Sequence, residues 1–593
     1  MPFGAECAEG TARFRLWAPA CRKIRCEVRG ATHEMTNLPE GWHELVVPDV
    51  GAGTLYSFVL EDGTRVPDPA SRMNPRDANG PSALVDPRAF EWRDDAWRGR
   101  PWREAVVYEL HVGTFTPEGT FAAAIGKLDH LADTGITAIE LMPVAEFPGR
   151  RNWGYDGVLP FAPDGAYGTP EDLKRLVESA HARGLMVLLD VVYNHFGPEG
   201  NYLSRYAPQF FNAAHQTPWG AAINFDGVRS RTVRDFFIHN ALYWVEEFHL
   251  DGLRLDAVHA IADRSPTHIV SEIARALAEG PGRTREVHLI LENDANEVRL
   301  LDPRAGGAAA TAQWNDDWHH AAHVLATGER DGYYEDYAEI PARQLARCLA
   351  EGFAYQGERS KHRGGKARGA PSARLPPQAF VPFLQNHDQV GNRAFGERLA
   401  AFAPPEALRL ATATLLLAPS VPLVFMGEEF GASTPFLYFC DFAGDLARAV
   451  REGRRREFAA FARFRGDAER EKIPDPNAES TFAASRLRWE EIAEVEHAEW
   501  LARYRALLNL RRELIVPRLA GERHDARFEA EGAHAIAVDW ILGDGSRLHL
   551  RANFGAAEEH VRRAAGAIVH TEGDCSASWG LPPWGGIWTL EPA

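Results

Sequence analysis

Short apolar runs recur along the chain from residue 106, and each is followed by a stretch with helical periodicity. The runs are VVYELHVGTF at 106, AIELMPV at 138, GLMVLLDVVYNH at 184, GLRLDAVH at 252, EVHLILEN at 286, FVPFLQNHD at 380 and PLVFMGEEFG at 422. Fully apolar strands that alternate with helices indicate βα units and a parallel sheet. A more polar eighth run, AQWNDDWHH at 312, is sixth in order. Eight such units predict an α/β fold, the (β/α)8 TIM barrel.

The patterns on either side of the barrel predict two further domains. Near the N-terminus, ARFRLWAP, KIRCEVRG and TLYSFVLEDG alternate apolar and polar residues, which is typical of a β-sandwich. The tail repeats this pattern in HAIAVDW, RLHLRANF and GIWTLEP, so a C-terminal β-sandwich is expected. We predict an N-terminal β-sandwich over residues 1–95, the barrel over 96–510 and the C-terminal β domain over 511–593. The Trp- and Arg-rich segment FEWRDDAWRGRPWRE would link the first two.

Two insertions interrupt the βα pattern. Residues 196–230 follow the third strand and are rich in aromatic side chains. Residues 354–377 carry Gly, Pro, Arg and Lys with little apolar content. We expect the second insertion to be a mobile surface loop or lid whose positive charge faces solvent.

Composition excludes several classes of partner. The net charge of -18 disfavours nucleic acid and anionic membranes, since both repel an acidic protein. No stretch approaches the ~20 apolar residues of a transmembrane helix, and MPFGAECAEG lacks the features of a signal peptide. The six cysteines are scattered without zinc-ligand spacing, which favours reduced thiols. We therefore expect a cytoplasmic location and no nucleic-acid or membrane partner.

Acidic residues follow the apolar part of several predicted strands, which is the catalytic face of such a barrel. Retaining hydrolysis of a glycosidic bond needs two carboxyl groups about 5 to 5.5 Å apart. Asp256 and Glu292 would end the fourth and fifth strands and lie side by side, and Asp388 would end the seventh. Arg254 lies two residues before Asp256, so it shares that face and would keep Asp256 ionised.

Four segments in this order resemble the four signature regions of the α-amylase superfamily, glycoside hydrolase family 13. They are DVVYNH, GLRLDAVH, LEN and QNHD. The resemblance implies that Asp256 is the nucleophile, Glu292 the general acid and base, and Asp388 the group that binds the sugar's 2- and 3-hydroxyls. It also implies sugar binding by the following residues of these motifs and of NWGYDG: Tyr155, His195, Arg254, His259, Asn386 and His387.

Longer segments resemble one family within this superfamily, the malto-oligosyltrehalose trehalohydrolases. They are NWGYDG, TPWGAAINFDG, QWNDDWHHAAH, FLQNHDQVGNRAFGERL and the region from YGTPEDLKRL to GPEGNYL. The resemblance implies hydrolysis of the α-1,4 bond next to a terminal trehalose, and functional pairing with malto-oligosyltrehalose synthase. Trehalose would then sit beyond Glu292, and the candidates for its binding are Trp219, Asn224, Trp314, Asn315, Asp316, His319 and His320.

Three alternatives stay open at this point. A glucan branching or debranching enzyme would share the barrel but transfer chains or cut α-1,6 links. A catalytically dead glucan-binding scaffold would lack a carboxylate, although all three are present. A metal-dependent hydrolase would use His319 and His320 as ligands, which neighbouring positions on a strand disfavour. Asn194 ligates calcium in many α-amylases, but the following excursion is short and poor in carboxylates, so we predict neither metal nor cofactor.

Overall fold

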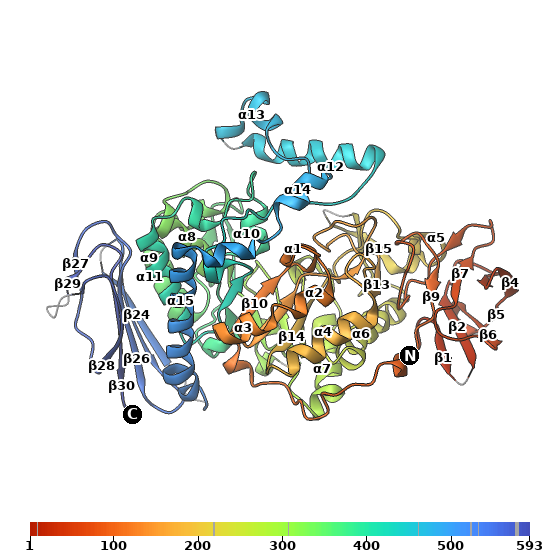
Figure 1. Ribbon diagram of the computed structural model, residues 1–593, viewed down its shortest axis with the longest axis horizontal. Coiled ribbons are helices and arrows are strands. Elements are labelled where there is room, and N and C mark those ends of the chain that lie inside the picture. The colour runs from red at the N-terminus through yellow and green to blue at the C-terminus, as the bar shows by residue number, and fades with distance from the viewer. Residues whose placement is uncertain are drawn as a thin grey trace.

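The computed structural model describes residues 1–8, 10–217, 220–305, 308–460, 462–521, 525–531, 533–575 and 580–593. Figure 1 shows three parts in a row: an N-terminal pair of sheets at one end, a central barrel, and a C-terminal sheet at the other end. The helices α12 (Gly444–Glu457), α13 (Asp467–Glu471) and α14 (Glu479–Ala484) follow the last barrel strand, and α12 and α13 stand out above the barrel. None of the helices in the described ranges is long and apolar enough to cross a membrane.

The N-terminal part contains two antiparallel sheets, as the alternating pattern predicted. One sheet has the order β1 (Glu6–Ala8), β2 (Thr11–Trp17), β6 (Trp42–Pro48) and β5 (Thr36–Asn37). The other has β4 (Ala31–Glu34), β3 (Arg25–Val28), β7 (Leu55–Val59) and β8 (Arg65–Val66), with β9 (Ser82–Ala83) also on β7. Phe14 of the first sheet and Phe58 of the second are both fully buried. Strand alternation therefore gives each sheet an apolar inner face.

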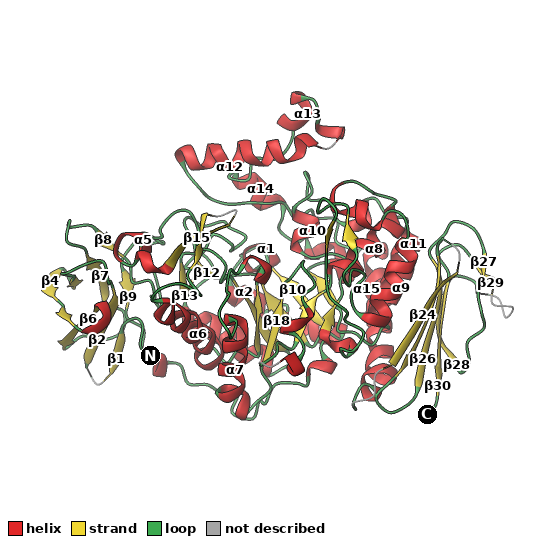
Figure 2. Ribbon diagram, turned by 180° about the vertical axis from the view of Figure 1, so that it is seen from behind, coloured by secondary structure: helices red, strands yellow, loops and turns green. Residues whose placement is uncertain are grey.

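Eight parallel strands form the barrel, in the chain order that the sequence predicted. They are β10 (Val107–Leu110), β11 (Ala138–Leu141), β14 (Met186–Val191), β17 (Gly252–Leu255), β18 (His288–Leu291), β19 (Ala312–Trp314), β22 (Phe380–Val381) and β23 (Leu423–Phe425). β23 pairs with β10, and a parallel bridge between Phe383, two residues after β22, and Leu423 of β23 closes the other side. The sheet is thus closed, and Figure 2 shows its strands at the centre of the helices.

The helices around the barrel begin and end where local chemistry dictates. The longer ones are α3 (Leu128–Thr134), α4 (Pro170–His181), α6 (Ser230–Glu247), α7 (Ile269–Glu279), α8 (Asp316–Thr327), α9 (Pro341–Glu351), α11 (Pro405–Leu416) and α15 (Val495–Leu510). At the start of α4, Thr169 and Asp172 exchange hydrogen bonds in a capping box, and Pro170 occupies the first turn. Three short helices lie at the barrel mouth: α1 (Val112–Phe115), α2 (Phe121–Ile125) and α10 (His387–Gly391).

The predicted linker crosses the amino-terminal face of the barrel. The indole of Trp97 stacks on His181 and donates to Asp251 at 2.7 Å, while the two ring nitrogens of His181 lie 2.8 Å from Asp94 and 3.0 Å from Asp251. His181 and Asp251 precede β14 and β17, so these contacts lie at the ends of the strands opposite the catalytic face. The linker is therefore fixed to the barrel by a buried cluster of charged and aromatic side chains.

The C-terminal part is an antiparallel sheet of five strands with a short ribbon beside it. The sheet has the order β24 (Asp525–Glu531), β25 (Ala535–Ile541), β26 (Arg547–Asn553), β30 (Gly586–Glu591) and β28 (Ala567–Glu572). The ribbon pairs β27 (Glu559–His560) with β29 (Gly580–Leu581). Trp540 of β25 is buried and donates to the carbonyl of Leu349 on α9, so this sheet packs directly on the barrel.

Candidate active site at the barrel mouth

Asp256 and Glu292 lie side by side at the carboxyl ends of neighbouring strands. Each is the first residue after its strand, and the preceding residues Leu255 and Leu291 are partners in the register of β17 and β18. The sequence prediction that these two carboxyl groups meet at the barrel mouth is therefore confirmed. Asp388 departs from the prediction in detail, because β22 ends at Val381 and Asp388 lies on α10.

The guanidinium of Arg254 joins three carboxyl groups at the mouth. Its Nη1 lies 2.6 Å from Asp190 and 3.0 Å from Asp256, and its Nη2 lies 3.0 Å from Glu292. The Arg254 side chain is fully buried and its Cζ lies 4.0 Å from the ring centroid of Trp314. Period-2 geometry places Arg254 and Asp256 on one face, as the spacing predicted.

Asp256 is held in its ionised form. Burial alone would raise its pKa, but Arg254 and a 2.7 Å hydrogen bond from the side-chain amide of Asn194 lower the pKa below its usual value. His195 adds a further favourable interaction with the carboxylate. An ionised carboxylate at this position has the chemistry of a nucleophile.

Glu292 has the opposite electrostatic environment. Burial and the neighbouring carboxylates Asp256 and Asp388 raise its pKa well above the usual value, against the opposing effect of Arg254. Its Oε2 accepts hydrogen bonds from Arg254 at 3.0 Å and from the backbone N–H of Ala257 at 2.8 Å. Ala257 has a φ of 42°, an uncommon conformation for a residue with a side chain. A protonated Glu292 therefore carries its proton on Oε1, the other oxygen.

Asp388 is positioned by the residues around it on α10. The side-chain oxygen of Asn386 caps this helix by accepting from the backbone N–H of Asp388 at 2.9 Å. Asn392 donates to Oδ1 of Asp388 at 3.1 Å, and Nε2 of His387 lies 3.5 Å from Oδ2. The Asp388 side chain is 38% exposed, against 12% for Asp256, so it is the most open of the three carboxylates.

Tyr155 and His195 lie beside Asp256 and are fixed by hydrogen bonds and ring contacts. The Tyr155 hydroxyl donates to Asp190 at 2.6 Å, and its ring stacks on His387 with centroids 5.1 Å apart. Nε2 of His195 lies 3.0 Å from the carbonyl oxygen of Tyr155, and Nδ1 contacts the side-chain oxygen of Asn194. These sequence-predicted residues therefore form one connected cluster beside Asp256.

A cleft of about 500 Å³ opens from Glu292 and Asp388. Its lining includes three residues that the sequence singled out as sugar-binding candidates, His259, Asp316 and His320. His259 lies in the short helical turn Val258–Ala260 that follows β17, and Asp316 and His320 lie on α8. The remaining lining residues are Glu292, Asp294, Tyr333, Asp336, Tyr337, His362, Arg363, Arg368, Asp388, Gln389 and Asn392. Tyr333, Tyr337, Arg363 and Arg368 were not foreseen as site residues.

Several expected substrate contacts do not line this cleft. Trp314 is buried under Arg254, and Asn315 caps α8 while donating to the carbonyl of Gly352. The nitrogens of His319 lie 2.6 Å from the Leu384 carbonyl and 3.1 Å from the Tyr334 hydroxyl, deep in the core. Asn224 bonds to the backbone of its own loop at Gln209, Gly227 and Val228. These four side chains therefore make structural contacts within the protein. Trp219 lies outside the described residues.

The helical course of α8 corrects another expectation. His319 and His320 were placed on a strand, but the strand ends at Trp314 and both histidines lie on α8, with ring centroids 5.3 Å apart. Among the described residues, no group of three or more His, Cys, Asp or Glu is arranged to hold a metal ion. The side-chain amide of Asn194 is engaged by Asp256 and His195.

The basic insertion is folded against the barrel mouth. It contains the short hairpin of β20 (Arg359–Ser360) and β21 (Lys366–Ala367). Arg363 lies 2.5 Å from Asp294, and Arg368 lies 2.9 Å from the buried Asp317. The prediction that this charge faces solvent is therefore wrong for these two arginines, which line the cleft.

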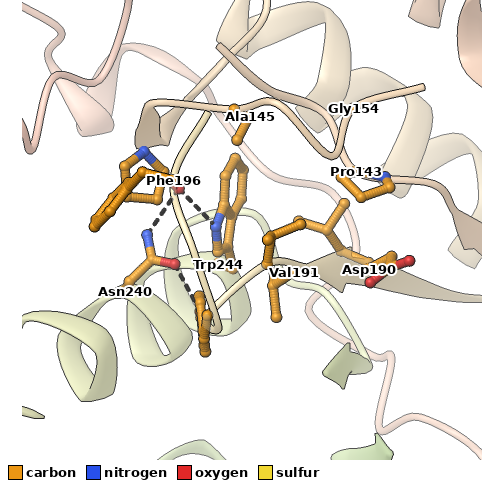
Figure 3. A pocket seen from close by; sticks show the side chains of 13 residues that line it. Pro143, Ala145, Gly154, Asp190, Val191, Phe196, Asn240 and Trp244 are labelled. Carbon is orange, nitrogen blue, oxygen red and sulfur yellow. Dashed lines mark hydrogen bonds between the residues drawn. The ribbon is translucent and has the colours of Figure 1, made fainter. Parts of the chain in front are cut away.

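A second, much smaller cavity lies behind the third strand (Figure 3), where Val191, Phe196 and Trp244 surround it. The side chains of Asn240 and Trp244 both donate to the carbonyl of Pro160, at 2.8 and 3.1 Å. Its volume of about 20 Å³ accommodates a single water molecule and no sugar ring. Of these two cavities, the cleft beside Glu292 is the one large enough for a sugar ring.

Comparisons with known proteins agree with this geometry. The family model "Alpha amylase, catalytic domain" matches residues 85–241, and a domain of unknown function (DUF3459) matches residues 523–588. The malto-oligosyltrehalose trehalohydrolase of Deinococcus radiodurans is 43% identical, and the match covers 93% of this chain and 88% of the relative. The malto-oligosyltrehalose trehalohydrolase of Saccharolobus solfataricus is 42% identical, and the match covers 86% of this chain and 87% of the relative. A crystal structure of a putative alpha amylase from Salmonella typhimurium is 48% identical with a TM-score of 0.94, covering 100% of this chain and 99% of its own. A 1,4-alpha-glucan branching enzyme of Streptomyces avermitilis is 39% identical over 42% of this chain and 45% of its own.

Proposed function

Because this chain belongs to the malto-oligosyltrehalose trehalohydrolase family of the α-amylase superfamily, we propose that it hydrolyses the α-1,4-glucosidic bond next to the terminal trehalose of malto-oligosyltrehalose. The products are trehalose and a shortened malto-oligosaccharide. The observation that carries the proposal is the opposite electrostatic environment of Asp256 and Glu292 around one arginine. A nucleophile and a proton donor are what retaining hydrolysis requires.

In the proposed first step, Asp256 attacks the anomeric carbon and the bond to the leaving oxygen breaks. Glu292 gives the proton on Oε1 to that oxygen, so trehalose leaves as a neutral alcohol. The ionised Glu292 then takes a proton from water, which attacks the glycosyl–enzyme bond and releases Asp256. Asp388 and His387 bind hydroxyls of the sugar whose bond is cleaved, and Tyr155 stacks against that sugar.

Trehalose would occupy the cleft on the Glu292 side, since the proton donor faces the leaving group. His259, Asp316 and His320 offer polar contacts there, as do the unforeseen Arg363 and Tyr337. Burial together with nearby carboxylates raises the pKa of Asp316 to about 7, against the opposing effect of Arg368. Asp316 can therefore both donate to and accept from sugar hydroxyls near neutral pH.

We also propose a cytoplasmic location, on the sequence features described above, and a supply of substrate by malto-oligosyltrehalose synthase. A branching or debranching activity is the alternative. The branching enzyme that this chain resembles matches over less than half of either protein, whereas the trehalohydrolases match over more than four fifths. This difference favours trehalose release.

The test is a side-by-side assay on maltopentaosyl-trehalose and maltoheptaose, with products separated by chromatography. The two substrates differ in the final linkage, so any preference arises from contacts with the last sugar. We expect kcat/KM to favour the trehalose-ended substrate by about a hundredfold, roughly 2.7 kcal/mol, which one or two well-placed hydrogen bonds supply. Equal rates would indicate a general α-amylase, and new α-1,6 links in amylose would indicate a branching enzyme.

A further inference from the structure

Glu109 is a buried carboxylate of β10 with both oxygens bonded to one residue, His387. Its Oε1 lies 2.5 Å from Nδ1 of the His387 ring, and its Oε2 accepts from the His387 backbone N–H at 3.0 Å. Both side chains are almost fully buried. In the barrel wall, β23 stands between β10 and β22, so this contact spans a whole strand. The carboxylate therefore fixes both the backbone and the ring of His387.

Aromatic side chains leave the His387 ring little freedom to turn. Tyr155 stacks on it with an interplanar angle of 24°, and Trp153 meets it edge-on with centroids 5.4 Å apart. Because Nδ1 is held by Glu109, Nε2 is the nitrogen on the side of Asp388, whose Oδ2 lies 3.5 Å away. The ring thus presents Nε2 to the position where we propose that the sugar binds.

The charges around this ring favour its protonated form. Burial would lower the pKa of His387, and Arg254 opposes protonation too, but Asp388 and Glu109 raise the pKa to about 9. Both ring nitrogens then carry hydrogen at neutral pH, and Nε2–H is a charged donor. The neutral His111 faces the same region and adds no competing cation, because burial lowers its pKa to about 4.

Glu140 is a matched neighbour that makes no such contact. It lies beside Glu109 in the register of β10 and β11, and it is 1% exposed. Neither of its oxygens has a hydrogen-bond partner, and burial and the charge of Glu109 raise its pKa well above the usual value. Asp190 adds to that effect, while Arg254 and the nearby His387 oppose it. Glu140 is therefore neutral, and its geometry gives it no part in holding His387.

We propose that Glu109 is the positioning residue of the site, which holds His387 so that its Nε2–H donates to a hydroxyl of the sugar whose bond is cleaved. This inference rests on the glucan hydrolysis proposed above and adds a residue that does not touch substrate. Both oxygens of Glu109 are hydrogen-bonded to His387. Glu140→Gln is therefore the control, since it changes a buried carboxyl group of the same layer without removing a hydrogen bond of His387.

The first measurement needs no substrate. The protein is labelled with ¹⁵N-histidine, and the ring signals of His387, assigned by their loss in His387→Asn, are followed against pH. In the wild type and in Glu140→Gln, His387 stays protonated at neutral pH. In Glu109→Gln we expect a neutral ring, because Asp388 then has to oppose both burial and Arg254 without the help of Glu109. An unchanged titration in Glu109→Gln overturns the proposal.

The second measurement is kinetic. Glu109→Gln should lower kcat by roughly tenfold to a hundredfold, the range expected when a charge-assisted hydrogen bond is lost in the transition state. The deficit should shrink as the pH falls and His387 is protonated again. In a His387→Gln background, Glu109→Gln should add little further loss. Equal losses in Glu140→Gln and Glu109→Gln would show that interior packing, not His387, is responsible.

Two precautions keep the outcome clear. If Glu109→Gln does not fold, Glu109→Asp replaces it. The shorter carboxylate keeps the negative charge but cannot hold both hydrogen bonds to His387. His387 should then stay protonated while kcat falls. An unchanged kcat in that variant contradicts the proposal. Absence of trehalose preference in the product assay would overturn the proposed function only, since the ¹⁵N measurement reports on Glu109 without any substrate.

Discussion

Nη2 of Arg254 lies 3.0 Å from Oε2 of Glu292, so a permanent cation contacts the carboxyl group that we propose as the proton donor. A cation alone would favour the ionised form of Glu292. Burial and the carboxylates Asp256 and Asp388 outweigh it, and the pKa of Glu292 rises well above its usual value. Arg254 thus helps to bring the pKa of Asp256 below its usual value, whereas at Glu292 it only reduces the increase in pKa that burial and the neighbouring carboxylates cause.

The pH dependence of stability should reveal this raised pKa. Between the ordinary pKa of Glu292 and its raised folded value, the folded state keeps a proton that the unfolded state has lost, so stability falls as pH rises through that window. Glu292→Gln removes this dependence. The melting temperature of the variant, measured relative to that of the wild type, should therefore increase as the pH rises from acid to neutral. A constant difference across that range would contradict the raised pKa.

Glu292→Gln should also separate the two parts of the reaction. A sugar alkoxide leaves poorly without a proton, whereas fluoride leaves without help. With α-glucosyl fluoride the first step should remain close to the wild-type rate, while hydrolysis of the natural glucan falls by several orders of magnitude. Single-turnover kinetics on both substrates measures this. Equal losses would assign the proton donor to another residue.

Asp256→Asn should give a folded protein whose activity is lower by several orders of magnitude, because an amide cannot attack the anomeric carbon. Asparagine keeps the size of the side chain and can still accept from Arg254. The check is turnover of malto-oligosyltrehalose by the purified variant, with circular dichroism as the control for folding. Retention of more than about a tenth of wild-type turnover would refute the nucleophile assignment.

Arg254→Ala should be among the most destabilising substitutions at the mouth. It leaves three carboxyl groups without their shared partner, and loss of one partner of a buried ion pair costs about 3–5 kcal/mol. Arg254→Lys should be intermediate, since one ammonium cannot contact all three groups. The matched control is Arg183→Lys, whose partner Asp129 is 74% exposed, so the change should be less than about 1 kcal/mol. Melting temperatures compare the three variants.

Chelators should leave activity unchanged, because the proposed reaction needs only carboxyl groups and hydrogen-bond donors. The measurement is turnover before and after dialysis against EDTA, with calcium or zinc added back. Activity that disappears with EDTA and returns with either ion would make Asn194 a candidate ligand again.

The barrel and the three carboxylates were predictable because their signals are local. An apolar run that ends in Asp256 or Glu292 predicts a buried strand, and it also predicts that the carboxyl group lies at the carboxyl end of that strand. The leaving-side cleft was only partly predictable, since all eight residues of QWNDDWHH are polar or aromatic. The start of α8 at Asp316 decides their directions: Asp316 and His320, four residues apart on one helical face, line the cleft, and His319 turns into the core.

The arginines of the basic insertion were not predictable at all. Arg363 meets Asp294 across 69 residues of sequence, and no periodicity or spacing in the chain reports such a contact. Glu109 left a weak signal, a charged residue inside the otherwise apolar run VVYELH, which Glu140 in AIELM shares. The sequence could not distinguish the two, because the difference between them lies in the position of His387.

The linker beneath the barrel limits where a barrel fragment can begin without losing contacts of the barrel. His181 lies between Asp94 of the linker and Asp251 of the barrel, and a chain that begins at residue 96 would lack Asp94. Trp92, which stacks on His249, would be lost as well. Excision of the barrel for engineering therefore has to begin before Trp92, which is consistent with a family match that starts at residue 85.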